Sequence, residues 1–189
     1  MKYQILLLHG MGKNISSIKG MRDVELLFQI YDDNFYLVHD CNQSIPSFIK
    51  RNNFDAIIMT STFMDHVKRY EIGSEWHRQY SFLTDTKALK VVFSQDDYWL
   101  SAVRDEFYTD NKIDIVLPSV QSESWNDLFP LYSKAGNLIQ GYTTYLTPHI
   151  RSLEKFSKPW DDRKIDFFYR ASGLPTFPNS LGKVKAEIG

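Results

Sequence analysis

The chain has 189 residues, the size of one ordinary domain, and 43% of them are hydrophobic, which is enough for a packed core without disulfides or metals. Its 22 basic residues nearly balance its 23 acidic ones, so the net charge gives no indication of a surface that binds nucleic acid or an anionic membrane. The lone Cys41 can form no internal disulfide and no cysteine-rich zinc site, which favours a reducing compartment and predicts a cytoplasmic protein. No apolar run is long enough for a signal peptide or a transmembrane segment.

Short apolar runs, each typical of a strand buried on both faces, recur along the chain as far as Pro118. They cover Tyr3 to Leu8, Phe35 to Val38, Phe54 to Met59, Leu89 to Phe93 and Ile113 to Leu117. Pro118 ends the last run because proline has no N–H to donate to a neighbouring strand.

Segments with helical periodicity separate these runs, and Ser74 is a plausible N-cap for one of them. The expected helices cover Met21 to Tyr31, Ile45 to Arg51, Ser74 to Asp85 and Tyr98 to Tyr108. Alternating strands and helices are typical of βαβ crossovers. The sequence therefore predicts an α/β fold, Rossmann-like and doubly wound, with a mostly parallel sheet and helices on both faces.

The pattern is less regular after Ser124. Trp125 to Tyr132 is expected to form one short helix, and Asn137 to Tyr142 either a strand or a loop. A polar stretch from Ser157 to Lys164 contains a proline and several charges, and it leads to a last strand-like run, Ile165 to Tyr169. We expect a single domain over residues 1–189.

The sequence LLLHGMGKN places a glycine-rich turn at the end of the first strand, where backbone N–H groups can approach a phosphate. The turn matches no Walker A loop, and the dinucleotide fingerprint requires a third glycine where Ile15 stands. His9-Gly10 matches the opening of an α/β-hydrolase oxyanion loop, but no Gly-x-Ser-x-Gly pentapeptide presents a nucleophile. Two interpretations stay open: Gly10, Gly12 and Lys13 bind a ligand, or the glycines only permit a tight turn.

A second polar cluster, Gln95-Asp96-Asp97, directly follows the fourth strand, and ligands of doubly wound sheets bind outside the carboxyl ends of strands. Asp97 is equally suited to cap the following helix. The chain has no Asp-x-Asp pair, and adjacent carboxylates seldom chelate one metal, so no metal site is expected. Four histidines are scattered along the chain: His39, His66, His77 and His149. They are better interpreted as solvated or core-edge residues than as metal ligands.

Three segments carry a family resemblance. Lys90 to Tyr98 is similar to a strand that ends in Gln-Asp-Glu, with Asp97 in place of the glutamate, and Ile113 to Leu117 follows the next helix. Asp162 to Pro175, followed by Leu181 to Lys185, contains Arg, two residues, Asp, two residues, Tyr-Arg, and then Leu-Pro and Leu-Gly. Together they resemble the N-terminal half of GT-B-fold glycosyltransferases, especially the bacterial group with family-1-like and spore-maturation-type members.

The resemblance implies the acceptor-side domain of a two-domain enzyme that transfers a sugar from a nucleotide-sugar to a sugar or glycan acceptor. Residues 157–189 would then approach the hinge to a missing nucleotide-sugar-binding domain, and the fragment alone would be inactive. The class holds the diphosphate with helix dipoles and basic residues, so neither a metal nor another cofactor is expected. Ala171 stands where the family pattern has glycine, and none of the segments is a catalytic signature.

His9 is then the candidate general base toward an acceptor hydroxyl, because neutral imidazole titrates near the working pH. If the first and fourth strands are neighbours, the two polar turns face each other across one crevice. The expected substrate-binding residues are Gly10, Gly12, Lys13, Gln95, Asp96, Tyr169 and Arg170. Two alternatives stay open: the two turns merely cap their helices, or the same architecture serves a non-catalytic binding or regulatory module.

Overall fold

The computed structural model describes residues 2–12, 33–69, 74–141, 152 and 154–164. The chain separates into two compact units, Met1–Thr147 and Pro148–Gly189. The described part of the second unit contains two short 3-10 helices, η4 (Glu154–Phe156) and η5 (Trp160–Asp162). The strand expected at Ile165 to Tyr169 lies outside the described residues, and the hinge approach over 157–189 stays a prediction.

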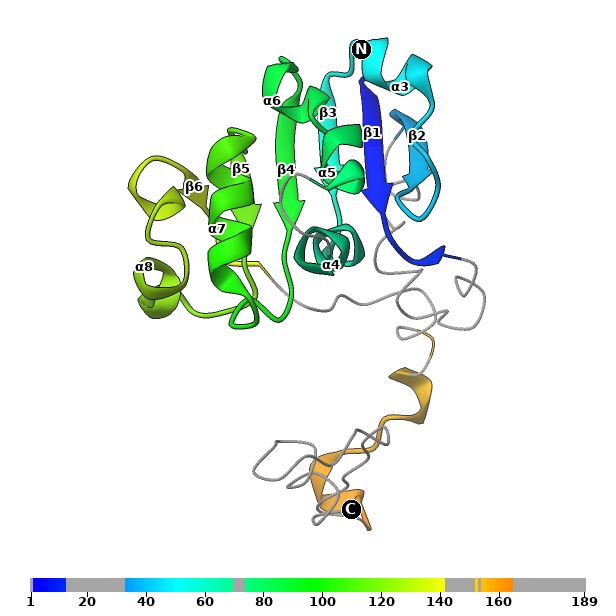
Figure 1. Cartoon of the computed structure of the whole chain (residues 1–189). Helices are drawn as coiled ribbons and strands as arrows, with labels where there is room; N and C mark the ends of the chain where they lie inside the picture. Colours follow the sequence, from blue (N-terminus) through cyan, green and yellow to red (C-terminus); the bar gives the residue numbers. More distant parts are fainter. Residues whose placement is uncertain (1, 13–32, 70–73, 142–151, 153, 165–189) are drawn as a thin grey trace. The chain divides into compact units, whose positions relative to one another are not determined.

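The first unit is built on a six-stranded parallel sheet with the order β2-β1-β3-β4-β5-β6 (Figure 1). Its strands are β1 (Gln4–His9), β2 (Phe35–Asp40), β3 (Ala56–Met59), β4 (Leu89–Phe93), β5 (Ile115–Leu117) and β6 (Asn137–Leu138). Each of the apolar runs between Tyr3 and Leu117 forms its expected strand, and the segment that begins at Asn137 is a strand. The Rossmann-like α/β fold is confirmed.

The helices of the first unit are α3 (Ser47–Arg51), α4 (Ser61–Arg69), α5 (Glu75–Gln79), α6 (Phe82–Asp85), α7 (Ser101–Asp110), η2 (Ser122–Ser124), α8 (Trp125–Leu128) and η3 (Tyr132–Lys134). In Figure 1, α4, α5 and α7 lie in front of the same face of the sheet. The helix expected over Met21 to Tyr31 lies outside the described residues.

Several predicted helices have different limits from those expected. The helix predicted from Trp125 to Tyr132 ends at Leu128, and the one predicted from Ile45 begins at Ser47. The helix predicted from Ser74 to Asp85 is divided into α5 and α6 at Tyr80, whose buried ring packs edge-to-face on Phe63 with centroids 5.1 Å apart. Ser74 does cap α5, because its hydroxyl accepts a hydrogen bond from the backbone of His77. The helix predicted from Tyr98 begins only at Ser101, since the residues before it form an exposed loop.

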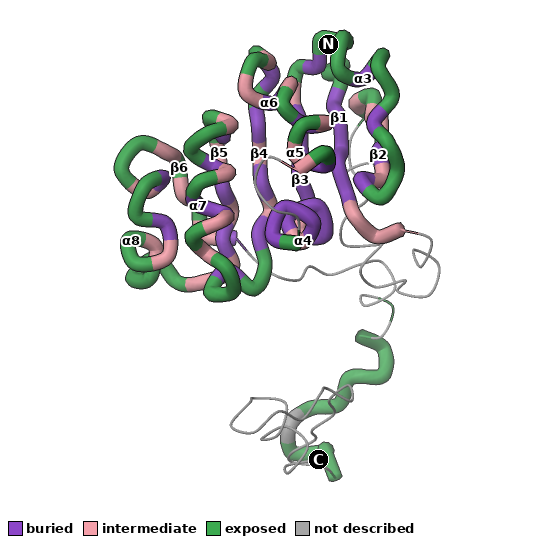
Figure 2. Tube along the Cα trace, in the orientation of Figure 1, coloured by how far each residue is buried: buried purple, intermediate pink, exposed green. Residues whose placement is uncertain are grey.

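The main hydrophobic cluster lies on one face of the sheet, and Leu7, on the opposite face, is also 0% exposed. Alternate residues of a strand point to the same face, and Leu6, Leu8, Ile57, Met59 and Val92 are all 0% exposed on the face of the main cluster. They pack against side chains of the helices, among them Phe63, Met64, Val67, Trp76, Leu83 and Tyr108. Figure 2 shows that β1 and β3 are buried over most of their length. Burial of this face fixes the register of the sheet and so the position of every strand end.

Candidate functional site

The order of strands reverses between β1 and β3, because β2 lies on one side of β1 and all later strands lie on the other. In open parallel sheets, ligands bind outside the carboxyl ends of the strands at such a reversal. β1 ends at His9, β2 at Asp40 and β3 at Met59. The edge formed by these ends, together with the loop after β4, is the candidate site and is called the carboxyl edge below.

His9 is 4% exposed at the end of β1. Its Nδ1 accepts a hydrogen bond from the backbone N–H of Met11 at 3.3 Å, and its carbonyl accepts one from the N–H of Cys41 at 2.7 Å. A neutral imidazole that accepts at one nitrogen carries its proton on the other. In this arrangement the proton of His9 is on Nε2. To act as a general base through Nδ1, His9 must first lose the hydrogen bond from the N–H of Met11.

The glycines of the β1 turn have local structural roles. The N–H of Gly10 donates to Thr62 Oγ1 at 2.8 Å, and a Cβ at Gly10 would lie 2.5 Å from the carbonyl oxygen of Thr62 and 2.6 Å from Nδ1 of His66. Gly12 has a φ of +62°, a conformation that favours glycine. Close packing of the end of β1 on α4 therefore explains the glycine at position 10. Ligand binding by this turn stays a prediction. Lys13 lies outside the described residues.

Asp40, Asn42 and His66 form a relay of hydrogen bonds at the carboxyl edge. Nδ2 of Asn42 donates to Asp40 Oδ1 at 2.7 Å, and Nε2 of His66 donates to Asn42 Oδ1 at 2.9 Å. Burial raises the pKa of Asp40, but the bonds from Asn42, the charge of His9 and the N–H of Gly12 outweigh it and hold that pKa below its usual range. The carboxylate is thus ionised at neutral pH and orients an imidazole through an amide.

The histidines beside this carboxylate are His66 and His39, and both have a lowered pKa. Burial lowers the pKa of His66, which is 4% exposed, and also that of His39, which is 7% exposed. The charge of Asp40 opposes both shifts without reversing them. From the sequence these histidines were expected to be solvated or core-edge residues, and both are buried. No local motif could have found the relay, because Asn42 and His66 are 24 residues apart.

Gln95 and Asp96 are exposed after β4, at the carboxyl edge as predicted, whereas Asp97 does not cap the next helix. Its side chain is 0% exposed and lies 2.9 Å from Arg104 Nη1. Its second oxygen accepts hydrogen bonds from the N–H and hydroxyl of Ser119, at 2.7 and 2.8 Å. A buried carboxylate requires a counter-charge and hydrogen bonds, and α7 and the β5 loop provide them.

The condition for a crevice shared by the first and fourth strands is not met, because β3 lies between β1 and β4. Two strand spacings separate the ends of β1 and β4 by roughly 10 Å. The polar turn at His9 and the exposed pair Gln95-Asp96 therefore flank the end of β3. Tyr169 and Arg170, the remaining predicted binding residues, lie outside the described residues.

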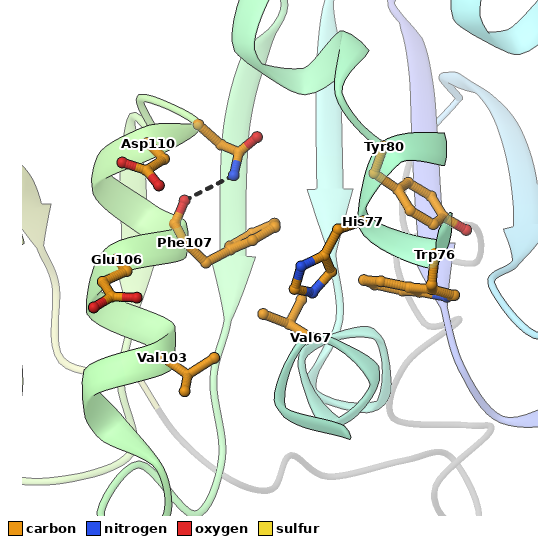
Figure 3. Close-up of a pocket in the computed structure, with 9 residues that line it drawn as sticks. Val67, Trp76, His77, Tyr80, Val103, Glu106, Phe107 and Asp110 are labelled. Carbon is orange, nitrogen blue, oxygen red and sulfur yellow. Dashed lines mark hydrogen bonds between the residues drawn. The ribbon is translucent and has the colours of Figure 1, made fainter. Parts of the chain in front are cut away.

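A cavity of about 140 Å³ lies in the helix layer between α4, α5 and α7 (Figure 3). It is lined by Val67, Trp76, His77, Tyr80, Val103, Glu106, Phe107, Asp110 and Asn111. Its walls are mostly aromatic and aliphatic, and Nδ2 of Asn111 is bonded to the carbonyl of Phe107 at 2.9 Å. None of these residues was predicted as a site, and the cavity is separate from the carboxyl edge.

Within the described ranges, no group of three or more His, Cys, Asp and Glu side chains is placed to hold a metal ion. The helices of the same ranges are all too short or too polar to cross a membrane.

Comparisons of the chain with known protein families, with curated proteins and with solved structures found no match.

Proposed function

We propose that this chain is the acceptor-side domain of a GT-B glycosyltransferase and binds a sugar or glycan acceptor along the carboxyl edge. One observation carries the proposal: an ionised carboxylate, an amide and two imidazoles gather where the strand order reverses. Sugar hydroxyls both donate and accept hydrogen bonds, so this mixture of groups suits them. The residues concerned are His9, Asp40, Asn42 and His66.

The spacing of the carboxyl edge supports a ligand longer than one ring. Gln95 and Asp96 follow β4, and the relay of Asp40, Asn42 and His66 lies on the other side of the end of β3. The ends of β1 and β4 are separated by roughly 10 Å. Two linked sugar rings span such a length. An acceptor bound in this way would contact the relay with one ring and the β4 loop with the other.

In the complete enzyme an acceptor hydroxyl attacks the anomeric carbon of a nucleotide-sugar, loses its proton to a base and displaces the nucleoside diphosphate. His9 is the proposed base, for which Nδ1 must release the Met11 N–H. Asp40 lies close enough to influence His9, and its negative charge stabilises an imidazole that gains a proton. The second domain, which the resemblance implies, would hold the donor, and the lone Cys41 favours a cytoplasmic location.

Calorimetric titration with a panel of mono- and disaccharides tests the proposal. We expect at least one saccharide to bind, and Asn42→Ala to weaken its binding about tenfold through loss of the relay. Asn53→Ala is the matched control, because Asn53 is an exposed asparagine just before the amino end of β3. Absence of binding by every saccharide of the panel would contradict the proposal.

One observation favours a second candidate, a non-catalytic binding or regulatory module. The N–H groups of Gly10 and Met11 are bonded within the chain, to Thr62 and His9, as expected of a turn that only closes a fold. The order β2-β1-β3-β4-β5 is also shared by folds with regulatory roles. A wild-type protein that binds no saccharide would favour this candidate.

A further inference from the structure

The loop between β4 and α7 exposes three consecutive apolar side chains at the carboxyl edge. Tyr98 is 67% exposed, Trp99 53% and Leu100 45%. Gln95 and Asp96, at the start of the same loop, are exposed as well. The loop thus presents aromatic rings beside an amide and a carboxylate.

The backbone of this loop has a positive φ at Asp96 and at Leu100, which is most unusual for the leucine. Asp96 has a φ of 52° and Leu100 a φ of 53°, in the left-handed region that residues other than glycine rarely adopt. Such residues persist only where their surroundings fix them, and they cluster at ligand sites. The helix predicted from Tyr98 to Tyr108 would have given Leu100 a negative φ.

A buried ion pair fixes the loop from beneath. Asp97 pairs with Arg104, whose guanidinium also donates to Ser94 Oγ at 2.8 Å and to the carbonyl of Gln95. The N–H of Trp99 donates to the carbonyl of Asp96 at 3.1 Å, closing a tight turn. The exposed rings are therefore carried by an ordered backbone, which lowers the entropy cost of binding.

Trp99 is oriented by a cation from α4. Nζ of Lys68 lies 4.5 Å from the centroid of a Trp99 ring and 2.7 Å from Asp65 Oδ1, and the Lys68 side chain is only 1% exposed. A cation over the ring face is attracted to it and restrains it. One face of the indole thus contacts the protein, while half of the residue stays exposed for a ligand.

We propose that Tyr98 and Trp99 form a stacking platform for a pyranose ring of the acceptor, whose hydroxyls bind Gln95 and Asp96; this inference rests on the function proposed above. A pyranose has an apolar C–H face and a polar rim, which match a flat aromatic ring beside an amide and a carboxylate. The Asp96 carboxylate disfavours an anionic bilayer as the occupant. It also disfavours a protein partner, because charged residues are depleted at the centres of protein interfaces.

Saturation-transfer NMR with N-acetylglucosamine, N,N′-diacetylchitobiose, maltotriose and mannobiose tests the platform. We expect the wild type to bind at least one of these saccharides and Trp99→Ala to weaken that binding about tenfold, a loss typical of a truncated tryptophan contact. Trp99→Phe retains a ring and should stay within about twofold of the wild type. The matched control is Phe48→Ala, an exposed aromatic on α3 (55%) away from the β4 loop.

Each other outcome overturns a defined part of the proposal. If the wild type and Trp99→Ala bind saccharide equally well, the stacking platform is ruled out, and the proposed function is unaffected. A wild type that binds none of the saccharides contradicts the proposed function, and the platform with it. Flotation with phosphatidylglycerol vesicles that is lost in Trp99→Ala, without saccharide binding, would assign the loop to a membrane surface instead.

Discussion

The carboxylate of Asp97 lies 2.9 Å from the guanidinium of Arg104, and both side chains are 0% exposed. The pair joins the loop after β4 to α7, and Ser119 after β5 binds the second oxygen of Asp97. Removal of one partner leaves an uncompensated buried charge, which costs far more than the pair contributes when intact. The ion pair therefore anchors the loop that carries Tyr98 and Trp99.

Arg104→Met tests this anchor. We expect the free energy of unfolding to fall by about 3–5 kcal/mol, because Asp97 is left buried without its counter-charge. Urea denaturation of the wild type, Arg104→Met and the exposed control Arg51→Met measures the difference. A loss below about 1 kcal/mol for Arg104→Met, no greater than that of Arg51→Met, would show that the pair does not anchor the loop.

Gly10→Ala distinguishes packing from ligand approach at the β1 turn. The added Cβ would lie 2.5 Å from the carbonyl oxygen of Thr62, so we expect overpacking to cost about 1–3 kcal/mol and to lower the melting temperature by several degrees. Calorimetric melting checks the value, with Ala102→Gly at an exposed position of α7 as a comparison for the glycine effect alone. An unchanged melting temperature with weaker saccharide binding would assign Gly10 to the ligand.

The strands and the class of fold were predictable because each strand is a short apolar run, most clearly β1 and β3, which are buried over most of their length. α4 was not predicted, because it buries Thr62, His66 and Lys68 as well as apolar residues, and hydrogen bonds rather than hydropathy make that burial possible. The strained loop was missed for a related reason: leucine rarely adopts a positive φ, and no sequence pattern indicates that Leu100 does.

The candidate site was predictable only in part. Gln95 and Asp96 follow β4 at the carboxyl edge, as strand ends in this class of fold require. The Asn42–His66 contact joins two strand connections that share no motif. The expected crevice depended on neighbouring first and fourth strands, and strand order is set by crossover connections that apolar runs do not specify.

Stability should decrease as the pH falls from about 7 to about 5. Burial lowers the pKa of His66 below the unfolded value of 6.5, so the unfolded chain binds more protons than the folded chain as the pH passes below that value. His66→Gln removes this titration and should flatten the dependence, although His39 and His77 retain shifts of the same sign. Urea denaturation at a series of pH values measures both slopes, and equal slopes would contradict the assignment. Asp40, with its lowered pKa, contributes only at more acidic pH.

Lys90 has a structural role at the opposite end of β4. Its Nζ donates to the carbonyls of Leu83 and Asn111, at 3.1 and 2.8 Å, and thereby joins the ends of α6 and α7 to the sheet. We expect Lys90→Met to cost about 1–3 kcal/mol, because two buried carbonyls lose their donor. Lys87→Met, an exposed lysine three residues earlier, is the control in the same urea experiment. Equal stability of the two variants would exclude the role.

The most direct test of saccharide recognition at the carboxyl edge is a ¹H–¹⁵N chemical-shift map of the protein titrated with N,N′-diacetylchitobiose and maltotriose. The proposal predicts saturable shifts at His9 to Met11, at Asn42 and over Gln95 to Leu100, while the amides of Lys50 to Asp55, beyond the amino ends of the strands, stay unchanged. Shifts confined to Lys50 to Asp55, or no saturable shift with either saccharide, would contradict it.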